Sequence, residues 1–210
     1  MVTIKPDILV IGAGSGGLSV AAGAAQMGAN VVLLEGHKMG GDCLNYGCVP
    51  SKALLAASKV QMEYSAAKDY VQEVLATIAP YDSVERFEKL GVRVITEFGS
   101  FISPTEVKAG DNIIRARRVV IATGSGPLIP KIPGLTDVPF YTNENIFDLR
   151  EKPKHLLIIG GGPIGMEMAQ AHRRFGCEVT VIEGQKALGK DDPEMSSIVL
   201  QSLRNDGINI

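Results

Sequence analysis

The sequence predicts an α/β fold built on doubly wound parallel sheets, and three observations predict it. Two short apolar runs, mostly of β-branched residues, each stand directly before a glycine cluster, and a helical stretch follows that cluster. This order of strand, glycine turn and helix occurs twice. Glycine is also abundant, at 24 of 210 residues, against a usual share of about 7%. Most glycines gather in four clusters, at 12–17, 36–47, 124–126 and 160–165.

The composition excludes several classes of protein. Hydrophobic residues make up 45% and charged residues 21% of the chain, which is typical of a globular protein. The net charge of −2 argues against a broad nucleic-acid-binding surface. The longest purely apolar runs have only about four residues, whereas a membrane-spanning helix needs roughly 20 and a secretory signal peptide roughly 7–15. We therefore expect a cytoplasmic protein with neither nucleic acid nor membrane as a partner.

The first unit begins near the N-terminus. An apolar run at 7–11 predicts a buried strand, and residues 12–17 satisfy the pattern G-x-G-x-x-G. An alanine-rich helix is expected at 18–27, and Gly28 stands where such a helix often ends. Taken alone the pattern is weak evidence, because a glycine-rich turn without a ligand satisfies it too.

A second strand and an acid complete this unit. The strand is expected at 31–34 and leads to Glu35, which can accept hydrogen bonds from ribose hydroxyls. Gly12 permits the tight turn, Gly14 lets a pyrophosphate approach, and Gly17 lets the helix pack on the strand. Free N–H groups at the helix start favour phosphate. The complete unit predicts dinucleotide binding, with contacts at Gly12, Gly14, Ser15, Gly16, Gly17 and Glu35.

The same unit recurs at residues 156–183. Its landmark residues Gly160, Gly176 and Glu183 each lie 148 residues after their counterparts in the first unit. Glu183 would accept from a ribose 2′-hydroxyl and repel a 2′-phosphate, so it favours NAD over NADP, although Lys186 and Lys190 temper this preference. Two units suggest two nucleotides, as in a flavoenzyme that exchanges electrons with a nicotinamide. The expected contacts here are Gly160, Gly162, Pro163, Ile164, Gly165 and Glu183.

Cys43 and Cys48 lie just after the first unit and admit three interpretations. They are two small buried thiols, part of a zinc site, or a redox-active disulfide. A zinc site needs two further ligands, and only Cys177 and three scattered histidines, which we expect in turns or at the surface, are available: His37, His155 and His172. A helix is expected after Pro50, and a thiol near its start should have a lowered pKa.

Residues 40–52, Gly-Gly-Asp-Cys-Leu-Asn-Tyr-Gly-Cys-Val-Pro-Ser-Lys, resemble the redox-disulfide signature of the class I pyridine nucleotide–disulfide oxidoreductases. This family includes dihydrolipoamide dehydrogenase, glutathione reductase and mercuric reductase. The resemblance extends along the whole chain, through the glycine patterns at 12–17 and 160–165, Ala-Thr-Gly-Ser at 122–125 and Ile-Pro-Gly-Leu at 132–135. It implies FAD at the first unit and NAD at the second.

The resemblance also implies roles for single residues. Cys43 would exchange with substrate sulfur, Cys48 would lie nearer the flavin, and Lys52 would lie near the reactive edge of the flavin ring. Glu167 would lie near the nicotinamide. Further FAD contacts would come from Gly41, Asp42, Ala122, Thr123 and Gly124, and adenine contacts from Phe98 and Gly99 on a strand.

Two features depart from the family. Asp42 stands where the family usually has Thr, so a cation, a water or an altered backbone must compensate for an acid near the pyrophosphate, or FAD binding is weakened. The helical stretch, expected as helices at 53–68, 69–78 and 84–90, is short, which indicates a deletion or a missing segment.

Strands expected between 92 and 121 form a β-meander inserted in the doubly wound sheet, with the basic run at 115–118 on its solvated edge.

We therefore expect a Rossmann-like FAD-binding domain with the redox-active disulfide at 1–150 and a truncated Rossmann-like NAD-binding domain at 151–210. The second domain should contain a helix at 193–205 and the start of a strand at Ile208. The family's catalytic His–Glu pair and C-terminal dimerisation domain have no counterpart, so the chain is expected to be the N-terminal part of a longer, homodimeric enzyme.

The sequence leaves the substrate open. A dihydrolipoamide dehydrogenase-like oxidoreductase would act on a small-molecule thiol or disulfide, and a mercuric reductase-like enzyme on a metal ion. Residues 50–52, Pro-Ser-Lys, are closer to both of these than to glutathione reductase. A catalytically incomplete nucleotide-binding fragment is the other alternative, while the cysteine pair disfavours a flavin hydroxylase.

Overall fold

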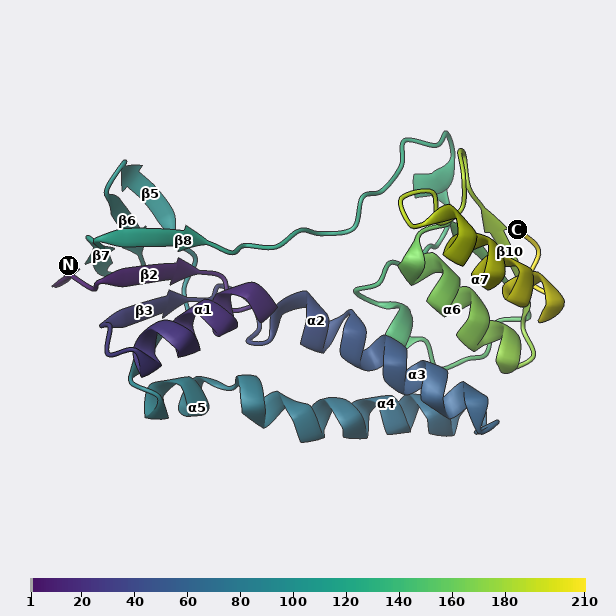
Figure 1. The fold of residues 1–210 in the computed structure, drawn as a ribbon, viewed down its shortest axis with the longest axis horizontal. Coiled ribbons are helices and arrows are strands. Elements are labelled where there is room, and N and C mark those ends of the chain that lie inside the picture. The colour runs from purple at the N-terminus through teal and green to yellow at the C-terminus, as the bar shows by residue number, and fades with distance from the viewer. Residues whose placement is uncertain (1) are drawn as a thin grey trace. The chain divides into compact units, whose positions relative to one another are not determined.

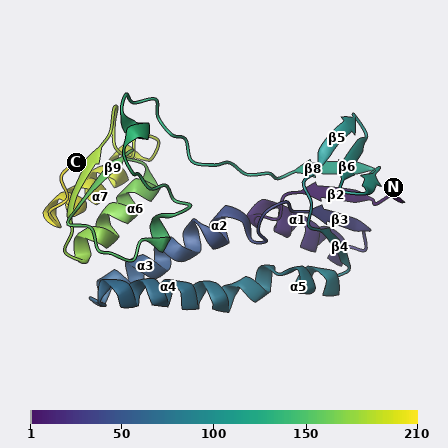
Figure 2. The same ribbon diagram turned by 180° about the vertical axis from the view of Figure 1, so that it is seen from behind.

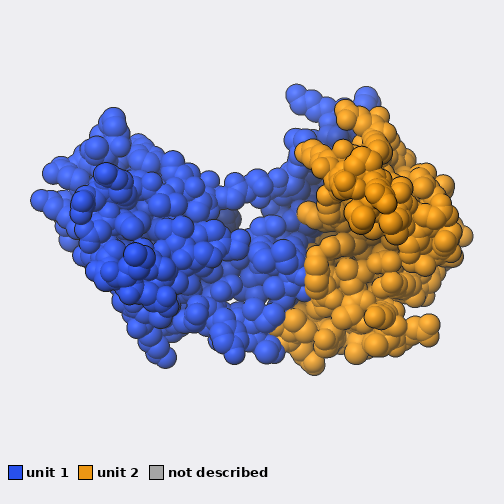
Figure 3. Space-filling view, viewed as in Figure 1, with its two compact units in different colours: residues 1–49, 75–144 blue, residues 50–74, 145–210 orange. Residues whose placement is uncertain are grey.

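The computed structural model describes residues 2–210, which form two compact units (Figure 3). Unit 1 consists of the chain up to Val49 together with Leu75–Glu144, and unit 2 of Pro50–Val74 together with Asn145–Ile210. The units do not follow one another along the chain, because two helices between residues 48 and 78 each run from one unit into the other. The division expected from the sequence, into 1–150 and 151–210, stays a prediction.

A parallel sheet forms the centre of unit 1. Its strands lie in the order β4 (Val92–Ile95), β3 (Val31–Leu34), β2 (Ile8–Ile11) and β8 (Arg118–Ile121). One face is covered by α1 (Ser15–Gln26), which connects β2 to β3, and by α5 (Val84–Lys89), which precedes β4 (Figure 1). Successive side chains of a strand point to opposite faces. Val10 therefore joins the core on the helix side, and Leu9 the core on the other side.

A second sheet covers that other face (Figure 2). Its strands lie in the order β1 (Val2–Ile4), β7 (Asn112–Ile114), β6 (Glu106–Ala109) and β5 (Ser100–Ser103). The meander is antiparallel and lies between β4 and β8 in the chain, but it pairs with β1 and does not join the doubly wound sheet. Its buried face packs on the parallel sheet through Val107, Ala109 and Ile114. Phe98 and Gly99 precede β5 and are not part of a strand, contrary to the prediction.

Three helices follow the first of the two repeated segments, the one that ends at Glu35. They are α2 (Gly41–Asn45), α3 (Cys48–Lys59) and α4 (Tyr64–Ile78), and the 3₁₀ turn Ala79–Asp82 comes after them. The predicted boundary between residues 68 and 69 is wrong, because the break falls at 60–63. Gln61 has a left-handed φ of 55°, and the N–H groups of Gln61 and Met62 bond back to the carbonyls of Ser58 and Ala57. This is a Schellman ending without its usual glycine. The Glu63 carboxylate then accepts from the N–H groups of Ser65 and Ala66 and begins α4.

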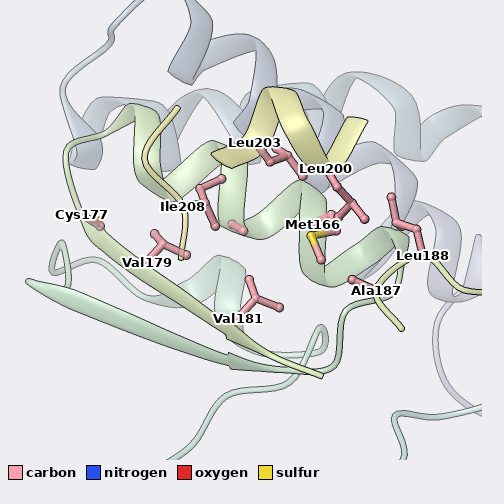
Figure 4. Close-up of a cluster of buried hydrophobic side chains, with 10 residues drawn as sticks. Met166, Cys177, Val179, Val181, Ala187, Leu188, Leu200, Leu203 and Ile208 are labelled. Carbon is pink, nitrogen blue, oxygen red and sulfur yellow. The ribbon is translucent and has the colours of Figure 1, made fainter. Parts of the chain in front are cut away.

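Unit 2 contains the second repeat of the sequence pattern. A parallel pair, β9 (His155–Ile159) and β10 (Glu178–Ile182), packs with α6 (Pro163–Arg174) and α7 (Pro193–Asn205). Side chains from β10, α6 and α7 point toward one another between the strands and the helices (Figure 4). The helix expected at 193–205 is confirmed, and Asn209 forms a single bridge with Thr180 where a strand was expected to begin. The core consists of Met166, Ala169, Cys177, Val179, Val181, Ala187, Leu188, Leu200, Leu203 and Ile208.

Candidate nucleotide-binding and redox sites

The first glycine loop is tightly packed between β2 and α1. Gly12 has a φ of 102°, and a Cβ built there would lie 2.3 Å from the carbonyl oxygen of Ala122. A Cβ on Gly17 would lie 1.8 Å from the carbonyl oxygen of Gly12. Gly14 occupies the N-cap and has no side chain to cover the N–H groups of the first helical turn, where Ser15 and Gly16 lie. Those N–H groups are therefore placed to bind a phosphate.

The acid after β3 holds this loop directly. Glu35 accepts from the N–H of Ala13 at 2.7 Å through Oε2 and from the N–H of His37 at 2.7 Å through Oε1. A carboxylate has about four lone-pair positions, so acceptor capacity remains for the hydroxyls of a ribose.

The second glycine loop repeats these contacts. Glu183 accepts from the N–H of Gly161 at 2.8 Å and from the N–H of Gln185 at 2.9 Å. These two backbone hydrogen bonds hold the pKa of the Glu183 carboxyl below its usual value, with Gly161 the larger cause. Gly160 has a φ of 111°, and a Cβ on Gly165 would lie 2.2 Å from the Gly160 carbonyl oxygen. Gly162 is the N-cap of α6, and Pro163 and the exposed Ile164 follow in its first turn.

The cysteine pair lies directly after the first unit. Cys43 is half-buried within α2, Cys48 is exposed at the first position of α3, and neither sulfur is part of a disulfide in this structure. The pKa of Cys43 is raised, first by burial, then by its hydrogen bond and charge interaction with Cys48, and to a smaller extent by the carboxylate of Asp42. The side chain of Asn45 ties this loop by donating to the carbonyls of Met39 and Gly41. The two thiols are thus close together, on the successive helices α2 and α3.

Asp42 has a partner that the sequence did not reveal. The Asn143 amide donates to Asp42 Oδ1 at 2.9 Å across 101 residues of chain. A Cβ built on Gly47 would lie 3.1 Å from Asp42 Oδ2, so the loop also closes against the other oxygen. The acid that was expected to need a cation, a water or an altered backbone therefore has a side-chain amide as donor. Asn143 carried no local signal in the sequence.

Lys52 and Glu167 meet in unit 2. Lys52 Nζ on α3 lies 2.5 Å from Glu167 Oε1 on α6. The two residues were predicted separately, one beside a flavin and the other beside a nicotinamide. The structure joins them as an ion pair across 115 residues of chain.

The remaining predicted contacts lie around the edges of these loops. Ala122, Thr123 and Gly124 follow β8, with Ala122 against Gly12. Phe98 is 65% exposed, and its ring meets the His37 ring edge-on at 5.2 Å. Gly99 lies beside Leu34 and Val107. The contacts of these residues with FAD stay predictions.

One histidine prediction is wrong. His172 was expected at the surface or in a turn, but it is fully buried on α6. Its Nδ1 lies 2.9 Å from the Met168 carbonyl oxygen and its Nε2 lies 3.3 Å from the Tyr64 hydroxyl. The sequence missed this because His172 is buried against Tyr64 of α4, which lies 108 residues earlier in the chain.

Residues 2–210 contain neither a cluster of metal-ligating side chains nor a membrane-spanning helix. No group of three or more His, Cys, Asp or Glu side chains there is arranged to hold a metal ion. No helix in the same range has the length and apolar composition that crossing a membrane requires.

Comparisons with known proteins point to one family. The model of the pyridine nucleotide-disulphide oxidoreductase family matches residues 6–210. Dihydrolipoyl dehydrogenase 2 of Arabidopsis thaliana, a chloroplastic protein, is 37% identical over 95% of this chain and 39% of its own length. Mercuric reductase of Bacillus cereus is 31% identical over 97% of this chain and 35% of its own length.

A solved structure agrees with the fold. A HOCl-induced flavoprotein disulfide reductase from Escherichia coli superposes with a TM-score of 0.87 at 30% identity, over 97% of this chain and 48% of that chain. The same reductase has been solved as a Cu(II) complex, which superposes with a TM-score of 0.87 at 29% identity. The chain thus spans less than half the length of these relatives.

Proposed function

The chain belongs to the pyridine nucleotide-disulphide oxidoreductase family, and from that premise we propose that it is the N-terminal part of an FAD-dependent enzyme whose Cys43–Cys48 pair exchanges electrons with NAD(P)H. In the reducing direction, NADH and one proton would reduce the disulfide to two thiols and leave NAD⁺. FAD would carry the two electrons between the nicotinamide and the sulfurs. The observation that carries the proposal is the closeness of the two thiols, which directly follow the first unit, where Glu35 accepts a hydrogen bond from the glycine loop.

The residues of the first loop suit FAD. The loop leaves the first N–H groups of α1 for a pyrophosphate, and Glu35 keeps acceptor capacity for a ribose. Gly41 and Gly14 lie against each other, since a Cβ on Gly41 would fall 2.6 Å from the Gly14 Cα. This close approach of bare backbone is what a pyrophosphate site needs. The adenine contacts of Phe98 and Gly99 belong to the same proposal.

The second loop suits NAD. Glu183 is held ionised against the loop by two N–H groups, so it would repel the 2′-phosphate of NADP. Glu167 and Lys52 are proposed to serve the nicotinamide and flavin ends of the electron path.

In the thiol chemistry we assign the exchange role to Cys43. Its thiolate would attack one sulfur of a substrate disulfide, the other substrate sulfur would leave as a thiol after taking up a proton, and Cys48 would then displace the substrate from Cys43. The reduced cofactor would then reduce the Cys43–Cys48 disulfide that remains and regenerate the two thiols. The raised pKa of Cys43 means that this attack should speed up with rising pH.

The substrate class is a small-molecule disulfide or dithiol of the lipoamide kind, with a metal ion as the second candidate. The relatives support both, since their names include dihydrolipoyl dehydrogenase and mercuric reductase, and one solved relative is a Cu(II) complex. The division into an FAD domain at 1–150 and a partial NAD domain at 151–210, a homodimeric parent and a cytoplasmic location complete the proposal.

The visible spectrum of the purified chain tests this function. We expect bound flavin and, after reduction with dithiothreitol or NADH, a long-wavelength thiolate-to-flavin charge-transfer band. Cys48→Ser should lose the band, Cys43→Ser should lose exchange with added disulfide, and Cys177→Ser should change neither, because that thiol is buried in unit 2. A flavin-loaded protein whose spectrum ignores all three substitutions would overturn the disulfide role. A colourless chain would favour the fragment without turnover.

A further inference from the structure

Unit 2 contains a buried polar cluster that the proposed function does not use. We call Tyr64 and Lys68 of α4 together with His172 of α6 the docking cluster; their exposed fractions are 3%, 1% and 0%. Lys68 Nζ donates to the Ile146 carbonyl oxygen at 2.9 Å and lies 5.2 Å from the centre of the Tyr64 ring. The cluster therefore joins α4 both to α6 and to the 3₁₀ turn Ile146–Asp148.

The hydrogen bonds of this cluster run in one direction only. The Met168 carbonyl can only accept, so His172 Nδ1 carries the proton and Nε2 accepts from the Tyr64 hydroxyl. Burial lowers the pKa of His172 to about 4, which keeps the ring neutral and this arrangement intact near neutral pH. Tyr64 also packs edge-on against Phe175 at 5.4 Å between ring centres.

An ammonium group in this place is unfavourable for stability alone. Burial lowers the pKa of Lys68 to about 8, against the opposing influence of Asp148. An apolar side chain of similar length would fill the same space without desolvating a charge. Buried polar groups of this kind serve in some proteins to specify one arrangement of packed elements over others.

The arrangement specified here is the one that brings Lys52 to Glu167. Helices α3 and α4 form one hairpin, and α6 carries both Glu167 and His172. The Lys52–Glu167 pair is itself exposed, at 60% and 29% of the two side chains. Exposed ion pairs add little to stability, so this pair cannot fix the hairpin against α6. The docking cluster is buried and contacts the same two elements.

We propose that the docking cluster of Tyr64, Lys68 and His172 positions Lys52 against Glu167 and so acts as a positioning element for the nicotinamide side of the reaction. The positioning step stands on the geometry of unit 2. Its relevance to electron transfer rests on the proposed function.

The test reads the Lys52–Glu167 pair directly. Reductive methylation attaches ¹³C-labelled methyl groups to exposed lysine amines, and NMR then records a signal for each labelled amine. The variant Lys52→Arg identifies the Lys52 signal by its loss. Glu167→Gln gives the position of that signal when the amine is unpaired. In Tyr64→Phe the ring stays and only the hydroxyl is lost. Loss of one buried hydrogen bond shifts a docking equilibrium by roughly fivefold to tenfold. We expect the Lys52 signal to move toward that of Glu167→Gln.

Lys68→Met separates positioning from mere stability. We expect its midpoint of thermal unfolding to hold or rise while the Lys52 signal still moves toward the unpaired value. The matched control is Asp69→Asn. Asp69 follows Lys68 in the chain and forms an exposed ion pair with Arg150, so this substitution should leave the Lys52 signal in place. A Lys52 signal that stays paired in both folded variants, Tyr64→Phe and Lys68→Met, would overturn the proposal.

This measurement needs neither flavin nor nicotinamide. A failed charge-transfer experiment would refute the proposed function and leave the positioning result standing. In a flavin-loaded enzyme the relevance is checked by half-reactions: Tyr64→Phe should slow reduction by NADH several-fold and leave reduction by dithiothreitol unchanged. Equal slowing of both would refute a role confined to the nicotinamide side.

Discussion

The two glycine units of this chain share their backbone hydrogen bonds and differ in what is attached to them. Ala13 and Gly161 each donate to the acid after the next strand, at 2.7 and 2.8 Å. Gly40 and Leu188 each donate back to the loop, to the carbonyls of Ala13 and Gly161. These contacts recur at the same offset of 148 residues as the landmarks in the sequence. The same local structure, a glycine loop bonded to the glutamate that follows the next strand, therefore occurs twice in the chain. We call this structure the module.

The differences begin where the module ends. In the first unit Gly41 has a φ of 57° and the chain turns into α2, which carries Asp42 and Cys43. In the second unit the position equivalent to Asp42 is Lys190, and the chain continues to the Asp192 cap of α7. Nucleotide binding is thus proposed for the shared part, and thiol chemistry for the part that only the first unit has.

The largest effect is expected where backbone meets backbone. Gly17→Ala would place a methyl group 1.8 Å from the Gly12 carbonyl oxygen, and Gly165→Ala one 2.2 Å from the Gly160 oxygen. We expect each to destabilise its loop by about 3 kcal/mol, with Gly17 the worse, because the oxygen cannot move without moving its strand. Urea unfolding measures this. Gly23→Ala in α1 is the control, since a Cβ there meets nothing within 4 Å, and it should stabilise by about 0.5–1 kcal/mol. Equal stability of Gly17→Ala and Gly23→Ala would contradict the packing described.

The stability of unit 2 should depend on pH, because the buried groups His172 and Lys68 both lie in that unit. His172 has a folded pKa of about 4 against 6.5, so the unfolded chain binds more protons between these values, and stability is lost as pH falls through that window. Lys68 has a folded pKa of about 8 against 10.5, so stability rises with pH across that second window. Each effect has an upper limit of about 3 kcal/mol.

Unfolding in urea at a series of pH values checks both windows. His172→Gln should flatten the acid window and Lys68→Met the alkaline one. His37→Gln, a change at an exposed histidine of unit 1, should alter neither. A wild-type profile that is flat from pH 8 to 10.5 would contradict the burial of a charged Lys68.

Substitution of Glu35 should affect the binding of FAD, and substitution of Glu183 should affect the binding of NADH. Glu183→Gln removes a charged acceptor for the ribose, and we expect NADH to bind about tenfold more weakly with less discrimination against NADPH. Glu35→Gln is the matched change and should reduce flavin content while leaving NADH affinity unchanged. Fluorescence titration with NADH and the flavin absorbance of the purified variants measure the two effects. Loss of NADH binding in Glu35→Gln would show that the assignments are exchanged.

The smallest effect concerns the residue that distinguishes the two units after the loop. Asp42→Asn removes a negative charge beside Cys43 and should lower the pKa of that thiol, speeding alkylation at pH 7 by about two- to threefold. The change is modest because burial and Cys48 are the larger causes of the raised pKa. Iodoacetamide kinetics in the Cys48→Ser background would measure it. If Cys43 is alkylated at the same rate in Asp42→Asn and in its parent, the Asp42 carboxylate does not contribute to the raised pKa of Cys43.

Local patterns in the sequence were enough to predict the two modules. Each one needs a strand, a glycine turn, a helix and an acid within about thirty residues, and every part follows from local rules of conformation. The bounds of α7 were predicted for the same reason, since Asp192 and Pro193 mark its start. The end of α3 is also local, but Gln61 replaces the expected glycine, so nothing in the sequence marked it.

Tertiary structure alone decided which distant residues meet. The pairs Asp42–Asn143, Lys52–Glu167 and Tyr64–His172 join residues 101, 115 and 108 positions apart, and none of these residues carries a local signal for its partner. The pairing of β1 with β7 is likewise long-range. A sequence pattern reports the conformation of a short segment, whereas burial and side-chain partners depend on how segments pack. The sequence by itself therefore determined the two glycine loops and the cysteine pair that follows the first of them, and only the packed chain determined how Asp42, Lys52 and His172 are held.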